Sequence, residues 1–233
     1  MIGFYNYTVL LTYLSLVSAG AGIFVSLAGA GHPYIGMFFL MACGLFDAFD
    51  GKVARTKSDR NRLECNFGIQ IDSLCDLVSF GVLPACIGGA VLRRSVFLSD
   101  LRSHGCLGTV LFALLFAVLI LYILAAVIRL AYFNVTEEER QKIEGGARKH
   151  YLGLPVTASA LIIPTFMLFH FITPNIDSSI GYFFVIILTG TAFLLPIRIP
   201  KPGLRGILIL ITIGVVEFIG LFLFWIMQKN GLR

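Results

Sequence analysis

Charged residues are scarce in this chain, since Asp, Glu, Lys and Arg make up only 13% of its 233 residues. Soluble globular domains carry about 25%, so the composition excludes an ordinary soluble protein. The chain is instead 58% hydrophobic with a mean hydropathy of +0.89, as expected for a polytopic membrane protein. Internal repeats, Pro-rich linkers and low-complexity tails are also missing, so a single integral membrane domain over residues 1–233 is expected.

The cysteines and histidines of the chain indicate neither a disulfide framework nor a metal site. The five cysteines, at 43, 65, 75, 86 and 106, form no C-x-x-C pair and are expected to be small, reduced packing residues. His32, His104 and His170 have no ligand partners at useful spacing, so a zinc site is not predicted. No nucleic-acid motif is present, and the net charge of +5 therefore suits an anionic membrane surface.

Long apolar runs define the expected architecture. Seven segments approach the ~20 residues that cross a bilayer core as a helix. They are 7–30, 33–55, 68–92, 106–132, 153–172, 180–197 and 204–227, the sixth being the shortest. The predicted fold is all-α: a polytopic membrane bundle of about seven transmembrane helices. No basic residue precedes the first apolar run, so a cleavable signal peptide is not expected.

Lysine and arginine are distributed unevenly between the two sides of such a bundle. Segments 55–67, 133–152 and 198–203 with their flanks hold eleven, whereas the opposite side holds five. The richer side should face the cytoplasm, which puts the N-terminus inside and the C-terminus outside. The expected location is the plasma membrane.

Four aspartates lie inside two of the apolar segments, where a carboxylate has a high free-energy cost of insertion. They are Asp47 and Asp50 in the second segment and Asp72 and Asp76 in the third. An acidic side chain at the bilayer centre costs about 2.5–3.5 kcal/mol on insertion scales. Several carboxylates at such depth imply a compensating charge, most simply bound cations, and a function.

The spacing places these aspartates on one face of each helix. Asp47 and Asp50 are related as i,i+3, and Asp72 and Asp76 as i,i+4. A basic loop joins the two segments, so they are expected to be antiparallel neighbours whose acidic faces converge. Asp47 precedes Arg55 by eight residues and should lie ~12 Å deeper, in a polar pocket below the cytoplasmic surface.

Carboxylates without a nearby histidine are hard oxygen ligands, which favour Mg²⁺, Mn²⁺ or Ca²⁺ over Zn²⁺ or Cu²⁺. Four negative charges exceed what one cation needs, so two divalent ions ~3.5–4 Å apart are expected, an arrangement used in phosphoryl chemistry. Gly51 and Ala54 are small residues beside this face, where they admit a bulky ligand or serve only helix packing. Lys52 and Arg55 stand where they can pair with phosphate.

The run D-x-x-D-G-x-x-A-R, followed by G-x-x-x-D-x-x-x-D, resembles the signature of the CDP-alcohol phosphatidyltransferase family. Its eight fixed positions are Asp47, Asp50, Gly51, Ala54, Arg55, Gly68, Asp72 and Asp76. The spacer of twelve residues between Arg55 and Gly68 is longer than is usual in that family and is expected to lengthen the cytoplasmic loop. The resemblance implies a six-helix core, a homodimer, and transfer of a phosphatidyl group from a CDP-linked lipid to an alcohol with release of CMP.

Three further strings, 72–85, 129–134 and 153–155, resemble the phosphatidylserine synthase branch of this family. By that resemblance the lipid is CDP-diacylglycerol or an ether-lipid equivalent, the acceptor is L-serine, and the products are phosphatidylserine and CMP. The likeness covers most of the first 160 residues. The last two apolar segments match only in being apolar.

The resemblance also implies roles for the matched residues. Asp47, Asp50, Asp72 and Asp76 would hold two Mg²⁺ or Mn²⁺ ions, and Asp76 would also be the general base on the acceptor hydroxyl. Gly51, Ala54, Arg55 and Gly68 would bind the CDP-lipid.

Free serine brings a carboxylate, which needs a cation. Arg129 is the one arginine in an apolar segment near the cytoplasmic side and is the first candidate, with a snorkelling helix-end residue as the alternative. Lys149 lies in a basic-aromatic stretch and is the second candidate, or else an interfacial anchor. Glu217 stands alone in the last segment, and its role stays open.

Two other functions remain open from the residues. The same chemistry with glycerol 3-phosphate or inositol phosphate as acceptor would need extra cations for the acceptor phosphate, a role that Arg129 and Lys149 can serve. A divalent-cation transporter would need polar residues that continue across the bilayer. Beyond Asp47 the helix offers only Cys43 and Gly44, so the outer half is expected to be sealed.

Overall fold

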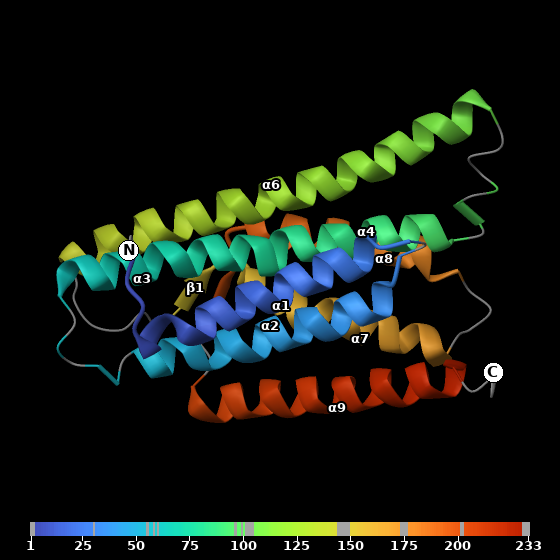
Figure 1. Ribbon diagram of the computed structural model, residues 1–233. Helices are drawn as coiled ribbons and strands as arrows, with labels where there is room; N and C mark the ends of the chain where they lie inside the picture. The colour runs from blue at the N-terminus through green and yellow to red at the C-terminus, as the bar shows by residue number, and fades with distance from the viewer. Residues whose placement is uncertain are drawn as a thin grey trace.

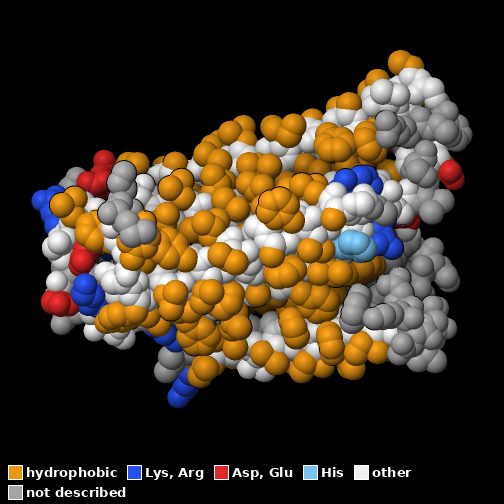
Figure 2. All heavy atoms as spheres, in the orientation of Figure 1, with side chains coloured by type: hydrophobic (Ala, Val, Ile, Leu, Met, Phe, Trp, Pro, Cys, Tyr) orange, Lys and Arg blue, Asp and Glu red, His pale blue; other side chains and the backbone are white. Residues whose placement is uncertain are grey.

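The computed structural model is a bundle of long, roughly parallel and antiparallel helices, which confirms the all-α membrane class (Figure 1). It describes residues 3–29, 31–54, 56–57, 59, 61–95, 97–98, 100, 105–143, 150–172, 177–200 and 203–229. Within these ranges, five helices are long and apolar enough to cross a membrane, and two shorter apolar helices accompany them. Figure 2 shows hydrophobic side chains over the middle of the visible face and charged side chains gathered toward its ends.

The helices overlap all seven predicted segments. The long ones are α1 (Leu10–Leu27, preceded by the short η1, Tyr7–Val9), α2 (Pro33–Ala54), α3 (Arg62–Asp76) continued by η2 (Leu77–Val82) and α4 (Leu83–Arg94), α6 (Cys106–Ile143), and α9 (Leu204–Lys229). The shorter ones are α7 (Ser159–Ile172), which follows η3 (Val156–Ala158), and α8 (Ser178–Leu194). At 38 residues, α6 is about 57 Å long and runs well past its predicted end at 132.

The spacer before the third span is not simply a longer loop, and this corrects the expectation from the sequence. Helix α3 begins at Arg62, so about half of the spacer is helical. Asn61 caps this extension, because its side-chain oxygen accepts a hydrogen bond from the Glu64 backbone N–H at 2.7 Å. The additional residues therefore lengthen α3 on the side of the membrane where Asp72 lies.

A small antiparallel sheet was not predicted. Strand β1 (His150–Leu152) pairs with β2 (Arg198–Pro200), with Tyr151 opposite Ile199. Strands of three residues carry too little alternation to be read from sequence. The pair ties the segment before α7 to the segment before α9, at the end of the bundle where α3 begins (Figure 1).

A seam of small polar residues joins α1 to α2 and η2. The Ser18 hydroxyl donates to the Phe39 carbonyl at 3.2 Å, and the Cys43 thiol donates to the Ser15 carbonyl at 3.3 Å. The Ser15 and Ser79 hydroxyls are 3.2 Å apart. Small side chains let membrane helices approach closely, and these bonds fix the rotation of α2 about its axis. That rotation decides where Asp47 and Asp50 point.

The third span changes from α to π geometry just after Asp76. Residues Leu77–Val82 are π-helical, and Pro84 follows at the start of α4. Proline has no N–H, so the carbonyl four residues earlier, that of Phe80, loses its α-helical donor. The hydroxyl of Tyr122 on α6 replaces it at 2.9 Å. The Tyr182 hydroxyl likewise donates to the Pro84 carbonyl at 2.6 Å.

We expect Tyr122→Phe to lower the thermal unfolding temperature of the detergent-solubilised protein. Tyr122 is 2% exposed, so the change leaves the Phe80 carbonyl buried without its donor, at a cost of about 1–3 kcal/mol. Tyr132→Phe is the matched control, since Tyr132 lies on the same helix and is exposed. Equal unfolding temperatures for the two variants would show that the Tyr122 hydroxyl does not stabilise the π segment.

Candidate active site

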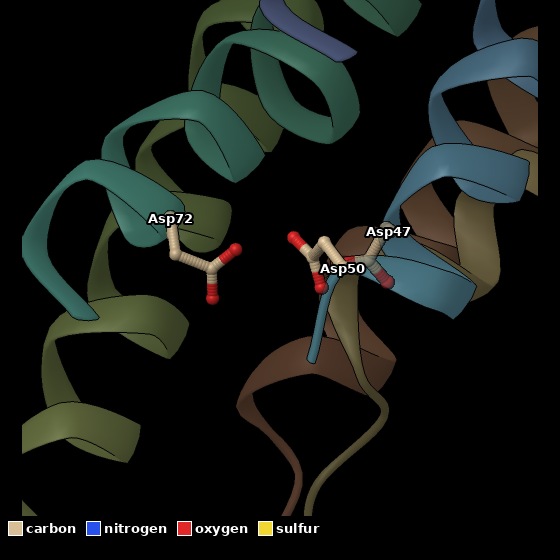
Figure 3. A group of neighbouring side chains, drawn as sticks. All are labelled: Asp47, Asp50 and Asp72. Atoms are coloured by element: carbon tan, nitrogen blue, oxygen red, sulfur yellow. The ribbon is translucent and has the colours of Figure 1, made fainter. Parts of the chain in front are cut away.

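Three aspartates from two helices meet at one end of the bundle. Asp47 and Asp50 lie in the last two turns of α2, and Asp72 lies in α3. One carboxylate oxygen from each can be chosen so that all three lie within 4.8 Å of one another. Figure 3 shows Asp72 facing Asp50 and Asp47 across the space between α3 and α2. The expected convergence is therefore present for these three residues, but α2 and α3 are not the direct neighbours that were expected, because α1 packs against both of them.

Asp76 is placed differently from the other three. It lies one turn beyond Asp72 on α3 and outside the compact group. It lines the same cavity as Asp47 and Asp72. Asp76 therefore borders the space in which a substrate beside the group would lie.

The compact group suits a divalent cation. Three half-buried carboxylates this close together repel one another strongly in a medium of reduced dielectric. An all-oxygen donor set is the one preferred by Mg²⁺, Mn²⁺ and Ca²⁺. Thr12 on α1 orients the group, because its hydroxyl donates to Asp50 Oδ2 at 3.3 Å. Three of the four aspartates predicted as ligands thus fit a divalent-metal site.

A cavity of about 1300 Å³ opens beside the aspartates and continues along α2, α7 and α9. Asp47, Asp72, Asp76 and Arg129 lie at one end, and Thr165 and Glu217 lie farther along it. Aliphatic and aromatic side chains form most of the wall between the two ends. The cavity can hold a molecule that has an anionic head beside the aspartates and a long apolar body.

Arg129 is buried at the head of this cavity and fixes a turn of the backbone. Its Nε donates to the Leu154 carbonyl at 3.1 Å, and its Nη2 lies 3.5 Å from the Gly153 carbonyl. Its guanidinium also lies over the Phe133 ring, 5.4 Å from the centroid. The strings 129–134 and 153–155, which were singled out separately in the sequence, are therefore in contact.

Gly153 is required by the shape of that turn. Its φ of +80° is in the left-handed region, and a Cβ there would lie 2.8 Å from the Phe193 carbonyl oxygen. Its N–H donates to the Ile197 carbonyl at 2.7 Å, beside the small sheet. Arg129 thus holds a turn that α8 and the segment before β2 already constrain.

Two positioning residues were missed in the sequence. Thr12 is one, although its spacing from Ser15 and Ser18 along one helix face offered a signal. The other is Asn134, which donates to the Ser73 hydroxyl at 2.7 Å and so ties α6 to α3 next to Asp72. Asn134 stands within one of the strings already singled out, but only the fold reveals its partner.

The remaining predicted residues are only partly placed. Gly51 is exposed and Ala54 half-buried in the last turn of α2, and Gly68 is half-buried one turn before Asp72. All three lie near the compact aspartate group along their helices. Arg55 and Lys149, predicted for the CDP-lipid and the serine respectively, lie outside the described residues.

Nearly the whole chain matches one known protein family. The family model described as CDP-alcohol phosphatidyltransferase matches residues 5–227, nearly the whole chain. The chain belongs to the CDP-alcohol phosphatidyltransferase family. The match reaches beyond the motif-bearing part that carries the resemblance in the sequence, and it includes the last two apolar helices. A comparison with solved structures found no match.

Curated relatives carry more specific names. The chain is similar to a CDP-diacylglycerol–serine O-phosphatidyltransferase of Saccharomyces cerevisiae, at 37% identity over 54% of this chain and 39% of the relative. A protein of the same name in Mycobacterium tuberculosis is 27% identical over 87% of this chain and 64% of its own length. An archaetidylserine synthase of Methanothermobacter thermautotrophicus is 29% identical over 81% of this chain and 68% of its own. The chain thus spans about two fifths to two thirds of these relatives.

Proposed function

We propose that this protein transfers the phosphatidyl group of CDP-diacylglycerol, or of an ether-lipid equivalent, to the hydroxyl of L-serine. The products would be phosphatidylserine and CMP. The observation that carries the proposal is the compact group of three carboxylates at the head of a long apolar cavity in a membrane bundle. Serine as the acceptor is supported by the names of the relatives, two of which are serine O-phosphatidyltransferases.

The carboxylates would hold two divalent ions, Mg²⁺ or Mn²⁺, with Asp47, Asp50 and Asp72 as the main ligands and Asp76 completing the set. Bound there, the ions would offset the negative charge of the diphosphate and the charge that develops on the leaving CMP. Thr12 would keep Asp50 oriented toward the group through its hydrogen bond. Gly51, Ala54, Gly68 and Arg55 would bind the nucleotide end of the lipid, in line with the family signature.

Asp76 would act on the acceptor. The serine oxygen attacks the phosphorus that bears the lipid, the bond from that phosphorus to the CMP oxygen breaks, and the serine proton passes to Asp76. A serine hydroxyl is a poor nucleophile, so a base within ~3 Å must take its proton. Support for this role is the position of Asp76, which lines the cavity one turn beyond Asp72 and outside the compact group.

Arg129 would receive the serine carboxylate. It is 6% exposed and lines the cavity together with Asp76, so the two residues can engage opposite ends of one small acceptor. A guanidinium matches a carboxylate geometrically and binds it by charge-assisted hydrogen bonds. Lys149 would assist from the segment before β1.

We expect Arg129→Ala to raise the KM for L-serine at least tenfold while the KM for the CDP-lipid changes little. Arg129 also holds the turn at Gly153, so kcat is expected to fall as well. The informative readout is the preference for L-serine over ethanolamine, which lacks the carboxylate. If Arg129 binds the serine carboxylate, the variant loses this preference. If Arg129 has only a structural role, the variant keeps it.

The arrangement in the cell forms part of the proposal. The N-terminus and the aspartate end would face the cytoplasm, where the Lys- and Arg-rich loops lie, and the protein would reside in the plasma membrane as a homodimer. CDP-lipid would then enter the cavity from the bilayer and serine from the cytosol. The whole of 1–233 would form one membrane domain.

The decisive test is CMP release by the purified protein in detergent with CDP-diacylglycerol and Mn²⁺. L-Serine, glycerol 3-phosphate and inositol phosphate would be compared as acceptors, and the lipid product identified by mass. Serine-dependent CMP release that EDTA abolishes is the expected result. Release only with a phosphorylated acceptor would move the protein to another branch of its family, and no release from folded protein with any acceptor would overturn the proposal.

A further inference from the structure

Glu217 is a buried acid far from the aspartates, and the proposed chemistry does not use it. It lies on α9, is 4% exposed, and lines the cavity together with Thr165 of α7. Its Oε1 is hydrogen-bonded to the Thr165 hydroxyl. Its Oε2 is itself buried and has no hydrogen-bond partner among the residues that the structure describes.

Thr165, the hydrogen-bond partner of Glu217 among the described residues, also contacts a second acceptor. The Thr165 hydroxyl also lies 2.7 Å from the Leu161 carbonyl, one turn earlier on α7. A hydroxyl has a single hydrogen, so it cannot donate fully to both acceptors. Glu217 Oε1 therefore either shares the Thr165 hydrogen with the Leu161 carbonyl or, in the protonated acid, donates to the Thr165 hydroxyl. In both arrangements Oε2 has no partner among the described residues, in a wall that is otherwise apolar.

Two contacts fix the depth of this carboxyl. A Cβ built on Gly44 of α2 would lie 2.7 Å from Ala160 Cβ on α7, so these two residues lie at the same depth along the bundle. Thr165 lies five residues beyond Ala160, and Gly44 lies three before Asp47, which places Thr165 ~12 Å from the Asp47 level. The rings of Phe38 and Phe218 are 5.1 Å apart, which puts Glu217 at a similar depth.

A carboxyl at this depth is costly. An acid near the bilayer centre costs about 2.5–3.5 kcal/mol, and a buried polar atom without a partner adds about 1–3 kcal/mol. A bound water molecule is a poor partner for this carboxyl. A buried water needs two to four polar partners, and the neighbouring wall residues Phe166, Ile213 and Phe218 are apolar. A polar group attached to a bound chain needs only one partner to be held there.

We propose that Glu217 and Thr165 form a polar subsite for a hydroxyl group carried on the hydrocarbon chain of the lipid substrate, ~12 Å from the aspartate level. The inference rests on the proposed function, since it needs the lipid chain to occupy the cavity. A hydroxyl both donates and accepts, so it can bond to this pair at the exposed Thr165 or at the Glu217 carboxyl, whichever way the hydrogen bonds within the pair are arranged. The pair would thereby select among CDP-lipids by the chemistry of their chains.

The test offers the protein an equimolar mixture of unsubstituted CDP-diacylglycerol and analogues with one hydroxyl at successive chain positions. Product ratios by mass give relative kcat/KM values. We expect the wild type to prefer one hydroxyl position about tenfold, equivalent to about 1.4 kcal/mol. Glu217→Leu should remove the preference while unsubstituted lipid still turns over, and Glu217→Gln, which keeps an amide oxygen, should retain part of it.

Thr165→Val should weaken the preference, and Thr212→Val is its matched control. Thr212 also donates to the carbonyl four residues earlier and is exposed like Thr165, but it lies on α9 outside the cavity wall. The same lipids are then compared for their effect on the thermal unfolding temperature. Wild type should be stabilised more by the preferred hydroxylated lipid than by the plain one, and Glu217→Leu should not.

Equal use of all the lipids by the wild type, with equal stabilisation, would overturn the subsite and leave water or internal packing as the role of Glu217. A preference that persists in both Glu217 variants would do the same. Absence of turnover with every lipid speaks against the proposed function instead, and the stabilisation measurement then still decides the subsite. If Glu217→Leu does not fold, Glu217→Gln carries the comparison.

Discussion

Asp50→Asn should abolish serine-dependent CMP release, with a loss of at least about 10³-fold. Asp50 belongs to the compact group of carboxylates and is the member held by Thr12. An amide keeps the shape but removes one negative charge and one anionic ligand, so the divalent ion loses affinity and the diphosphate loses its counter-charge. The assay is CMP release across a Mn²⁺ titration.

The same substitution should not unfold the protein. In the wild type the three carboxylates repel one another in EDTA, and Asp50→Asn relieves part of that repulsion. Its unfolding temperature in EDTA should therefore equal or exceed that of the wild type. Added Mn²⁺ should stabilise the wild type and not Asp50→Asn, because a ligand stabilises the state that binds it.

Asp59→Asn is the control for this experiment, since Asp59 is an exposed acid in the loop between α2 and α3. It should retain both activity and stabilisation by Mn²⁺. Substantial turnover by Asp50→Asn at saturating Mn²⁺ would remove Asp50 from the metal site. A collapse of its stability in EDTA would instead make the carboxylate structural.

The aspartate cluster was predictable because its geometry is local. Asp47 and Asp50 share a helix face through their spacing alone, and a short connection returns α3 along α1, so that Asp72 faces α2. The seven apolar segments were predictable for a similar reason, since hydropathy and length decide them together. Neither conclusion required knowledge of a contact between distant parts of the chain.

Contacts between distant residues account for what the sequence left open. Arg129 was chosen as a buried cation, but its bonds to the turn at Gly153 depend on how α6 packs against the segment before α7. The π segment after Asp76 accepts a hydrogen bond from a tyrosine of α6, and the partner of Glu217 is on another helix. Such pairings are set by helix packing, which side-chain periodicity within one segment does not report.

Asp76→Asn should separate proton transfer from metal binding. Asp76 lines the cavity beside Asp47 and Asp72 but lies outside the compact group, so its loss should leave the main metal ligands in place. We expect CMP release to fall about 10²–10⁴-fold, the usual contribution of a general base. Stabilisation by Mn²⁺ should persist, in contrast to Asp50→Asn.

The pH profile provides a second readout for Asp76. If its carboxylate removes the serine proton, the wild-type rate falls at low pH as the base becomes protonated, and the residual rate of Asp76→Asn lacks that limb. Asn134→Ala is the control variant. Asn134 hydrogen-bonds to Ser73 on the same helix as Asp76, and it has no proposed role in the proton transfer. This variant should lower the rate and keep the limb. Loss of Mn²⁺ stabilisation in Asp76→Asn, to the same extent as in Asp50→Asn, would make Asp76 a metal ligand first and leave the base to be found elsewhere.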